Sequence, residues 1–317
     1  MYIFDAEYVE NHLSSKVCTD VMENVIREER KGSVTQYLRT AIQMPNTNIL
    51  GIMPGYFEKG YFGAKVLSVY HTNQGTGFPS HQGEVILFSK EHGEVLAVVD
   101  AMAVTRIRTG AVSAVASKVF ARPGAENLAI LGCGAQGHSH LDAICSTMKI
   151  RKVTVWDQFR KAADGLAAYA EEKGIEAHAC DTAREAVREA DIVCTVTLSH
   201  EPILKREWLS PGTHVNAIGA CAPADREIDT ELAAESHFFG DNRDSVMHES
   251  GDFLIPIREG AYGEDHFAGT LGDVLLGKIQ GRKDDREITV FEGLGMAVED
   301  IACAVYLYEN ALKGGKA

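Results

Sequence analysis

The sequence predicts an α/β protein in which a doubly wound parallel sheet is inserted into an α+β domain. Three observations support this prediction. In residues 127–219, short apolar runs alternate with helix-like segments, as they do in doubly wound sheets. Residues 36–100 carry apolar runs separated by glycine, proline and asparagine, which favours a mainly antiparallel sheet. The apolar-faced helix expected after Gly293 crosses back to this first domain.

The composition is that of a globular protein with substantial cores. The chain has 317 residues, 45% hydrophobic and 24% charged, so two domains are expected. The net charge of -14 argues against a nucleic-acid partner, because such a partner requires a basic face. The chain does not open on a basic segment followed by an apolar one, and no run approaches the roughly 18 apolar residues of a membrane span. We therefore expect a cytoplasmic protein without membrane association.

The seven cysteines are scattered and form no CxxC pair. This pattern favours reduced thiols over a disulfide framework or a zinc site. Cys133 and Cys194 lie in glycine-rich or apolar strand contexts and are predicted to be small buried side chains. His138 and His140 are two residues apart, a spacing that turns helical side chains to different faces. No metal site is expected.

The first elements follow from periodicity. Residues 5–30 are predicted to form a helix, with Asp5 as a candidate cap and apolar residues recurring every four positions at Val9, Leu13, Val17, Val21 and Val25. Residues 62–70, 83–88 and 95–100 are then predicted to form strands joined by short turns.

Three cationic residues stand out in this first region. Lys65 lies between Ala64 and Val66 in a predicted strand, where its charge would need a partner. Arg108 precedes a helix of small residues, 109–117, and would lie near its first turn. The helix dipole disfavours a cation there unless an anion joins it. From spacing alone, Arg39, Lys65 and Arg108 could be anion-binding groups, surface charges or structural ion pairs.

The glycine-rich turn after residues 128–131 carries the strongest local signal. This apolar run is typical of a strand buried on both faces, and it leads into Gly132, Gly134 and Gly137 at GxGxxG spacing, with Ala135 and Gln136 between them. The three glycines would allow a tight turn, close approach of a pyrophosphate and close packing of the next helix, respectively. A second strand, 152–156, leads to Asp157, which is expected to accept from a ribose hydroxyl. The pattern predicts a Rossmann dinucleotide site.

The following elements place more of this site. Helices are predicted over 161–173 and 182–190, and extended segments over 176–180, 191–197 and 212–219. Ligands of doubly wound sheets lie beyond the carboxyl ends of the strands. The residues expected along the cofactor cleft are therefore Thr197, Leu198, Ser199, Gly219, Ala220 and Cys221.

Several motifs together resemble the ornithine cyclodeaminase and mu-crystallin family over nearly the whole chain. The matching pieces are residues 50–56 (LGIMPGY), 63–65 (GAK), 78–82 (FPSHQ), 105–113 (TRIRTGAVS), 195–203 (TVTLSHEPI), 212–220 (GTHVNAIGA) and 295–300 (GMAVED). The resemblance implies a substrate-binding and dimerisation domain of residues 1–118 plus 296–317, and a Rossmann domain of residues 119–295. It also implies a homodimer.

The same resemblance gives the cationic residues a function. In the family, the positions of Arg39, Lys65 and Arg108 gather around the substrate carboxylate. Guanidinium groups suit this task because they bind carboxylate bidentately. Cys221 is implied to lie at the substrate and Met296 at the cofactor.

Two departures from the family pattern select among its activities. Family cyclodeaminases carry an aspartate where this chain has Cys221 and a glutamate where it has Gly51. Without these acids, the chain is expected to reduce small imino or keto acids, as ketimine reductases, pyrroline-2-carboxylate reductases and alanine dehydrogenases of the family do. The pieces 50–56 and 78–82 are also similar to mu-crystallin, a ketimine reductase. An ornithine cyclodeaminase using Glu84 or Asp300 instead, or a crystallin-like carrier of small ligands, stays an alternative.

Two details of the chemistry are predicted less directly. His81 is a candidate proton donor, or else an ordinary packed or solvent-facing histidine. Mu-crystallin-like chains place Asn-Arg-Thr after the second strand to hold a 2′-phosphate, whereas this chain has Asp157 there, and a carboxylate repels a phosphate. NAD is therefore the expected cofactor, although Arg160 and Lys161 leave NADP open.

Overall fold

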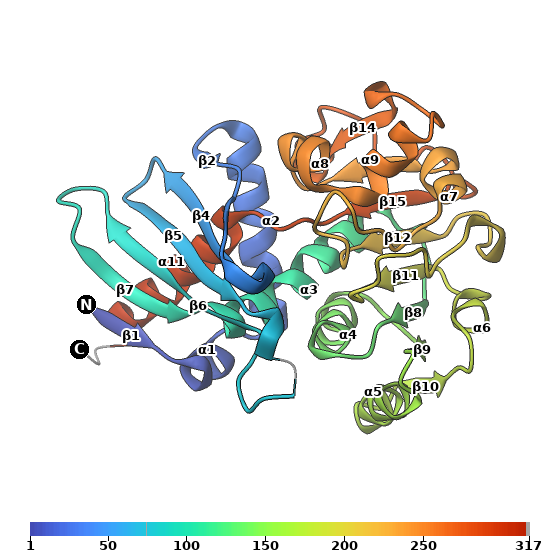
Figure 1. Ribbon diagram of the computed structural model, residues 1–317, viewed down its shortest axis with the longest axis horizontal. Coiled ribbons are helices and arrows are strands. Elements are labelled where there is room, and N and C mark those ends of the chain that lie inside the picture. Colours follow the sequence, from blue (N-terminus) through green and yellow to red (C-terminus); the bar gives the residue numbers. More distant parts are fainter. Residues whose placement is uncertain (74, 315–317) are drawn as a thin grey trace. The chain divides into compact units, whose positions relative to one another are not determined.

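The computed structural model describes residues 1–73 and 75–314, which form two compact units (Figure 1). The first comprises Met1–Arg108 and Gly295–Ala317, and the second comprises Thr109–Leu294. The second unit is thus inserted into the first, and the C-terminal helix belongs to the first unit. The first boundary lies ten residues before the expected one at 118/119. Helix α3 (Ala101–Phe120) continues through it, so no local break marks it in the sequence.

The first unit contains a seven-stranded sheet in the order β1-β7-β6-β5-β4-β2, with β3 paired to β4. The pairings are antiparallel except for β1 with β7, and the predicted strands 62–70, 83–88 and 95–100 are confirmed. The strands are β1 Tyr2–Phe4, β2 Val34–Gln36, β3 Thr40–Gln43, β4 Ile49–Phe57, β5 Tyr61–Val69, β6 His81–Ser89 and β7 Val95–Asp100. The short helices η1 Pro45–Thr47 and η2 His71–Asn73 lie between strands.

The helix predicted over residues 5–30 is two helices, α1 (Ala6–His12) and α2 (Ser15–Lys31). Asp5 caps α1 as expected, accepting from the backbone N–H of Tyr8 at 2.8 Å. The chain breaks because Ser14 adopts an extended conformation, and its hydroxyl caps α2. Helix α11 (Ala297–Lys313) packs against α2 and the sheet (Figure 1). It brings the two acids of its first turn, Glu299 and Asp300, into the core of the unit.

Helix α3 starts eight residues before the predicted helix 109–117. Asp100 accepts from the backbone N–H of Ala103 at 2.7 Å and so starts the helix directly after β7. Arg108 is therefore the eighth residue of α3, about two turns from its start. The expectation that it lies in the first turn is wrong, and the dipole of that turn does not act on it.

The second unit contains an eight-stranded parallel sheet in the order β10-β9-β8-β11-β12-β15-β13-β14, the doubly wound arrangement that the sequence predicts. Leu128 through Leu131 are fully buried, as expected for a central strand. The strands are β8 Asn127–Leu131, β9 Lys152–Trp156, β10 Glu176–Ala179, β11 Ile192–Thr195, β12 His214–Ala217, β13 His237–Gly240, β14 Phe267–Thr270 and β15 Thr289–Glu292.

The helices of this unit follow the strands in alternation. Those that the sequence predicts near 161–173 and 182–190 are present as α5 and α6, although α6 is shorter. The set is α4 Ala135–Thr147, α5 Arg160–Glu172, α6 Ala183–Val187, η3 Arg206–Trp208, α7 Thr230–Glu235, α8 Arg243–Glu249, α9 Gly251–Arg258, η4 Glu264–His266 and α10 Leu271–Leu275.

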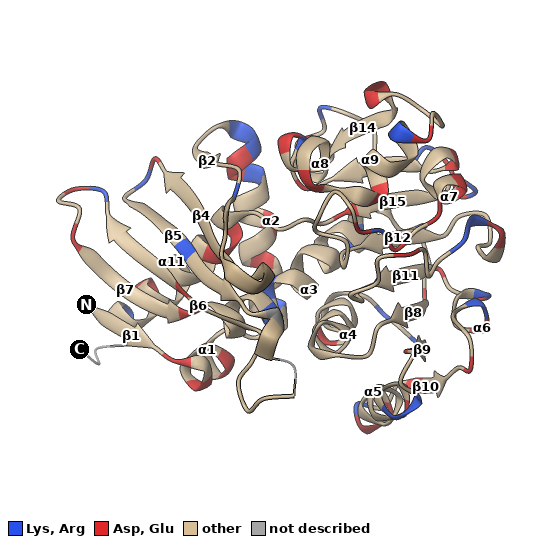
Figure 2. Ribbon diagram, in the orientation of Figure 1, with Lys and Arg blue, Asp and Glu red and all other residues tan. Residues whose placement is uncertain are grey.

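The buried cysteines follow the sequence prediction. Cys133 and Cys194 are buried as predicted, and burial raises the pKa of each thiol to about 12. Basic and acidic residues are interspersed, for example along α5 (Figure 2). In the described part of the chain, no helix is long and apolar enough to cross a membrane. Residues 1–73 and 75–314 also contain no group of three or more His, Cys, Asp and Glu side chains that could hold a metal ion.

Candidate active site

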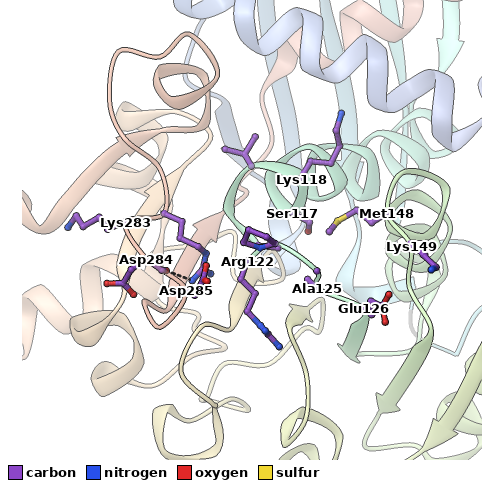
Figure 3. Close-up of a pocket in the computed structure, with 15 residues that line it drawn as sticks. Ser117, Lys118, Arg122, Ala125, Glu126, Met148, Lys149, Lys283, Asp284 and Asp285 are labelled. Carbon is purple, nitrogen blue, oxygen red and sulfur yellow. Dashed lines mark hydrogen bonds between the residues drawn. The ribbon is translucent and has the colours of Figure 1, made fainter.

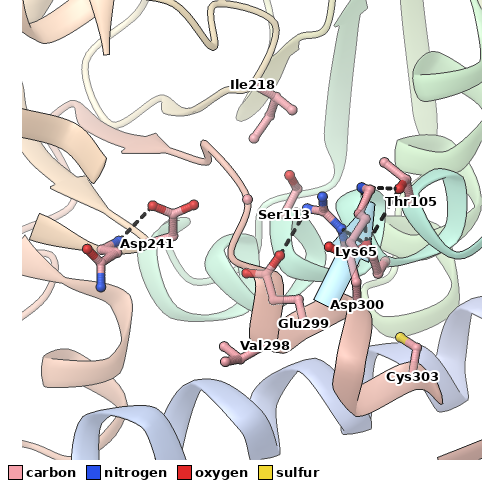
Figure 4. Close-up of polar contacts among 12 residues, drawn as sticks. Lys65, Thr105, Ser113, Ile218, Asp241, Val298, Glu299, Asp300 and Cys303 are labelled. Atoms are coloured by element: carbon pink, nitrogen blue, oxygen red, sulfur yellow. Dashed lines mark hydrogen bonds and ion pairs between the residues drawn. The ribbon is translucent and has the colours of Figure 1, made fainter. Parts of the chain in front are cut away.

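A cluster of buried charges lies in the first unit, between β5, α3 and α11 (Figure 4). Nζ of Lys65 donates to Oγ1 of Thr105 at 2.6 Å and lies 3.3 Å from Oδ1 of Asp300. Nε of Arg108 lies 3.3 Å from the same Asp300 oxygen, and Nη1 of Arg108 lies 2.9 Å from Oε2 of Glu299. All four charged side chains are buried. The structural ion pairs that the sequence left open are thus present for Lys65 and Arg108.

Sequence analysis did not identify Glu299 and Thr105, and it named Asp300 only as an alternative base. The signal that could have found the two acids is their position. They lie side by side in the first turn of α11, where the helix dipole favours negative charge, on a helix whose neighbouring residues are apolar. Two acids that the fold buries at such a place need cationic partners.

The charges in this cluster are unequal in number. Arg39 joins it through Gly295, whose carbonyl oxygen accepts from Nη2 of Arg39 at 3.3 Å. Gly295 has φ +82°, and a Cβ on it would lie 2.7 Å from Nη1 of Arg108. Only glycine therefore lets the backbone approach this guanidinium so closely. The five side chains, three cationic and two anionic, carry a formal charge of +1.

Burial and neighbouring charges set the proton affinity of these groups. Burial lowers the pKa of Lys65; Asp300 opposes this effect, whereas Arg108 and Arg39 add to it. Burial also acts against the charged form of Arg108, but Asp300 and Glu299 outweigh it and raise its pKa. The two net shifts are therefore opposite: the pKa of Arg108 is raised, and that of Lys65 is lowered.

His81 does not join this cluster. It is the exposed first residue of β6 and pairs with Val69, four positions along β5 from Lys65. That separation corresponds to about 13 Å of strand. Its Nδ1 lies 2.9 Å from Oγ of the neighbouring Ser80. The structure therefore gathers Arg39, Lys65 and Arg108, but not the fourth residue predicted to be catalytic.

The glycine turn of the second unit has the geometry that a dinucleotide site requires. Gly132 has φ +106°, and a Cβ there would lie 2.8 Å from the carbonyl oxygen of Val196. A Cβ on Gly137 would lie 2.4 Å from the carbonyl oxygen of Gly132, so this glycine lets α4 pack against the turn. A Cβ on Gly134 would meet nothing within 4 Å, so the turn is open on the side where a pyrophosphate would approach. Ala135 and Gln136 form the first turn of α4.

Asp157 lies against this turn. Its Oδ2 accepts from the backbone N–H of Cys133 at 2.8 Å, and its Oδ1 accepts from the backbone N–H of Phe159 at 2.9 Å. Arg160 points to other partners, because its guanidinium forms ion pairs with Asp164, at 2.7 Å, and with Asp181. Two carboxylates thus flank the arginine that could have met a 2′-phosphate. Lys161 is exposed on α5.

The residues predicted after β11 and β12 are joined by a carboxylate that the sequence analysis missed. Oε1 of Glu227 accepts from the backbone N–H and from Oγ1 of Thr197, both at 2.6 Å, and Oε2 accepts from the backbone N–H of Gly219 at 2.8 Å. Residues 226–228 carry no local signal for this contact. The other predicted cleft residues differ in exposure: Leu198 and Cys221 are exposed, Ser199 is half-buried, and Ala220 is buried.

Met296 is placed differently from these residues. It is fully buried, forms the N-cap of α11, and belongs to the first unit, next to Gly295. It therefore lies in the unit that holds the charge cluster, whereas the other predicted cofactor-binding residues lie in the second unit.

Two cavities lie elsewhere. One, of about 720 Å³, is formed before the amino ends of β8, β9 and β15, at the sheet edge opposite the glycine turn (Figure 3). Lys118, Lys149 and Lys283 at its border point in different directions (Figure 3), so they do not converge on one ligand. A second cavity, of about 450 Å³, lies between α2, α11 and the end of β4. The predicted site residues line neither cavity.

Fold and glycine turn define a protein of the Rossmann dinucleotide-binding class that carries a second unit with a buried cation–carboxylate cluster. The chain belongs to the ornithine cyclodeaminase/mu-crystallin family, whose sequence model matches residues 2–315. The resemblance seen in the motifs is thereby confirmed.

Individual relatives extend this result. Ketimine reductase mu-crystallin of Mus musculus is 36% identical over 315 residues, covering 98% of this chain and 97% of the relative. The structure of Thermococcus litoralis Delta(1)-pyrroline-2-carboxylate reductase, in complex with NADH and L-proline, is 34% identical, with a TM-score of 0.95 and coverage of 99% and 98%. An archaeal alanine dehydrogenase dimer with bound NAD is 33% identical, with a TM-score of 0.95 and coverage of 99% and 97%.

Proposed function

We propose that the protein is an NAD(H)-dependent reductase of small α-imino acids, which also accepts an α-keto acid together with ammonia or an amine. The observation that carries this proposal is the single excess positive charge of the cluster formed by Arg39, Lys65, Arg108, Glu299 and Asp300. One substrate carboxylate would neutralise it. The relatives named above act on, or are bound to, small imino and amino acids, which supports the same substrate class.

The residues of the cluster have distinct tasks in this proposal. Arg108 and Arg39 bind the substrate carboxylate, for which guanidinium groups are well suited. Lys65, whose pKa burial lowers, holds the proton that the imine nitrogen takes up. The incoming carboxylate favours the protonated form of Lys65 until that transfer. Thr105 and Asp300 hold the ammonium in place through the two contacts described above.

A dinucleotide whose pyrophosphate is held at the glycine turn would supply the hydride from its nicotinamide ring. Hydride adds to the imine carbon and a proton to the nitrogen, so the C=N bond becomes CH–NH. His81, distant from Lys65 along the sheet, has no part in the proposed proton transfer.

NAD is the proposed cofactor rather than NADP. Asp157 places a carboxylate beside the glycine turn, and Arg160 is already paired with Asp164 and Asp181. A 2′-phosphate would be repelled by Asp157 and would have to compete with Asp164 and Asp181 for Arg160. Both features lie in the second unit and are independent of the substrate.

Ornithine cyclisation is the less favoured activity. Cys221 and Gly51 replace the acids that would serve the substrate nitrogens, and a Cβ on Gly51 would lie only 3.0 Å from the side chain of Leu67. The suggested substitutes are also poorly suited. Asp300 already accepts from two cations, and Glu84 is an exposed residue of β6.

The protein is further proposed to be a cytoplasmic homodimer. Alternate residues of β4, β5 and β6 that point away from the buried positions are apolar but only half-buried, namely Ile52, Phe62, Val66, Ile86 and Phe88. A second copy would cover this sheet face. The dimeric state of the alanine dehydrogenase relative supports this occupant, and the seven free cysteines fit a reducing compartment. Light scattering should give a molar mass of two chains for the unchanged protein. The Phe62→Lys variant should have the mass of a single chain.

Turnover tests the main proposal. The protein is mixed with NADH and pyrroline-2-carboxylate, piperideine-2-carboxylate, or pyruvate with ammonia or methylamine, and NADH absorbance is followed. Saturable NADH oxidation with at least one of these substrates is expected. Tight binding of the imino acids without turnover would instead support a carrier of small anionic ligands.

A further inference from the structure

Glu227 is a buried carboxylate whose hydrogen-bond partners include two residues of the predicted cofactor cleft, Thr197 and Gly219. Its side chain is 0% exposed, and its two oxygens accept three hydrogen bonds from Thr197 and Gly219. Thr197 follows β11 and Gly219 follows β12, two adjacent parallel strands. One side chain therefore ties together the turns at the carboxyl ends of both strands.

The contact extends to a third predicted cleft residue. Oγ1 of Thr197 donates to Glu227 and accepts from the backbone N–H of Ser199 at 3.1 Å. At Gly219, a Cβ would lie 2.6 Å from the carboxyl group of Glu227, so the backbone approaches it as closely as only glycine allows. The positions of Thr197, Ser199 and Gly219 thus all depend on this carboxylate.

Glu227 is itself held rigidly. Its backbone N–H and that of Ile228 donate to Oδ1 of Asp252, at 2.8 and 3.0 Å. Its carbonyl oxygen accepts from the backbone N–H groups of Ile203 and Leu204, at 2.8 and 3.0 Å. The groups of Thr197 and Gly219 that donate to its carboxylate, two backbone N–H groups and one hydroxyl, are all neutral. Burial raises the pKa of the Glu227 carboxyl, and the hydrogen bonds from Thr197 and Gly219 oppose this shift by favouring the charged form.

We propose that Glu227 is a positioning residue that fixes the turns after β11 and β12 in the shape that binds the dinucleotide. The identity of the ligand rests on the proposed function, whereas the positioning of the turns does not. Glu227 acts through Thr197 and Gly219 and need not touch the cofactor.

The test compares Glu227→Gln with Glu292→Gln. A glutamine amide has one acceptor oxygen and one donor nitrogen, so either Thr197 or Gly219 would face a second donor. Glu292 serves as the control because it is also buried and repels Glu227 through space, but its Oε1 accepts from Ser250, at 2.7 Å, rather than from a donor of either turn. Hydrogen exchange of the protein without ligand is measured first. Glu227→Gln should speed exchange at residues 197–199 and 219–221, but not at 128–131, and Glu292→Gln should speed neither turn.

NADH titration then tests the consequence for binding. Glu227→Gln should raise the Kd for NADH by roughly tenfold to a hundredfold, the usual effect of an unsatisfied buried hydrogen-bonding group. The KM for the imino acid should stay unchanged. Unchanged exchange at both turns, or an equal loss of NADH affinity in Glu292→Gln, would overturn the positioning role.

A second variant keeps the test decisive if Glu227→Gln does not fold. Thr197→Val removes the hydroxyl that links Glu227 to Ser199 and should speed exchange at 197–199 while sparing 219–221. Exchange equal to that of the unchanged protein would contradict the proposal. If the unchanged protein binds neither NADH nor NAD, the proposed function fails, while the exchange result still decides whether Glu227 holds the turns.

Discussion

Nζ of Lys65 lies 3.3 Å from Oδ1 of Asp300, so a buried ammonium in the middle of β5 has a buried carboxylate partner from α11. This relationship changes the meaning of the cationic cluster. Lys65 and Arg108 both contact Asp300, so each has an anionic partner inside the protein before any substrate binds. Two internal acids offset two of the three positive charges, so these five side chains keep a formal charge of +1.

Asp300→Asn should shift the pH dependence of catalysis. Asp300 opposes the lowering of the Lys65 pKa by burial, so its removal should lower that pKa further. Lys65 must be protonated to act as the donor, and activity is lost as pH rises through its pKa. In Asp300→Asn, the alkaline fall of kcat/KM should therefore occur at lower pH. Glu309→Gln, on the same helix but bonded to Tyr61, is the control and should keep the original profile.

Arg108→Ala should affect both substrate recognition and stability. Losing the charge-assisted contact with the carboxylate should lower kcat/KM by about one to two orders of magnitude, corresponding to roughly 1.5 to 3 kcal/mol. Glu299 and Asp300 also lose a partner, which typically costs about 3 to 5 kcal/mol when an ion pair is buried. NADH affinity should barely change. Arg108→Lys should recover stability more than kcat/KM, because lysine restores the charge without the bidentate geometry. An equal loss of NADH affinity would show that Arg108 supports the dinucleotide instead.

Asp157→Ser should move cofactor preference towards NADPH. The substitution removes the carboxylate that repels a 2′-phosphate beside the glycine turn. The measured quantity is the ratio of kcat/KM with NADH to that with NADPH, which should exceed one in the unchanged protein and fall in the variant. A preference for NADPH before any substitution would contradict this account of Asp157.

The buried acids of the second unit predict a loss of stability towards neutral pH. Burial raises the pKa of Asp252 to about 7 and that of Glu292 well above its usual range; Glu227 adds repulsion, and Arg226 opposes the shift of Asp252. A raised folded-state pKa contributes stability below the unfolded value of 3.8, and this stability is lost as pH rises through the folded value. Unfolding free energies should therefore fall between pH values of about 4 and 7. Asp252→Asn should flatten this fall, whereas the exposed Asp20→Asn should leave it unchanged.

Ornithine should not be converted to proline at a useful rate. Cyclisation requires an acceptor near each substrate nitrogen, and a positioned base typically contributes about 10²- to 10⁴-fold. Cys221 and Gly51 supply no carboxylate. The protein is incubated with ornithine and NAD while ammonia is measured. Stoichiometric ammonia and proline, formed as fast as imines are reduced, would overturn the reductase assignment.

Local sequence determined much of this protein. The GxGxxG spacing between an apolar strand and a helix predicts the turn at Gly132, because its geometry depends on residues only a few positions apart. Asp5 as a cap, the antiparallel strands of the first unit and the parallel strands of the second follow from similar short-range signals. The family also follows from motifs that are each contiguous in the chain.

Only the tertiary structure decided which charges meet. Lys65 and Asp300 are 235 residues apart, and Thr197 and Glu227 are 30 apart, so no periodicity relates them. Helix α3 starts at Ala101, so Arg108 lies in the helix interior rather than in a first turn, and of the roles that spacing left open it has that of an ion-paired residue. Periodicity reports which face of an element is buried, whereas the partner of a buried charge depends on how distant elements pack.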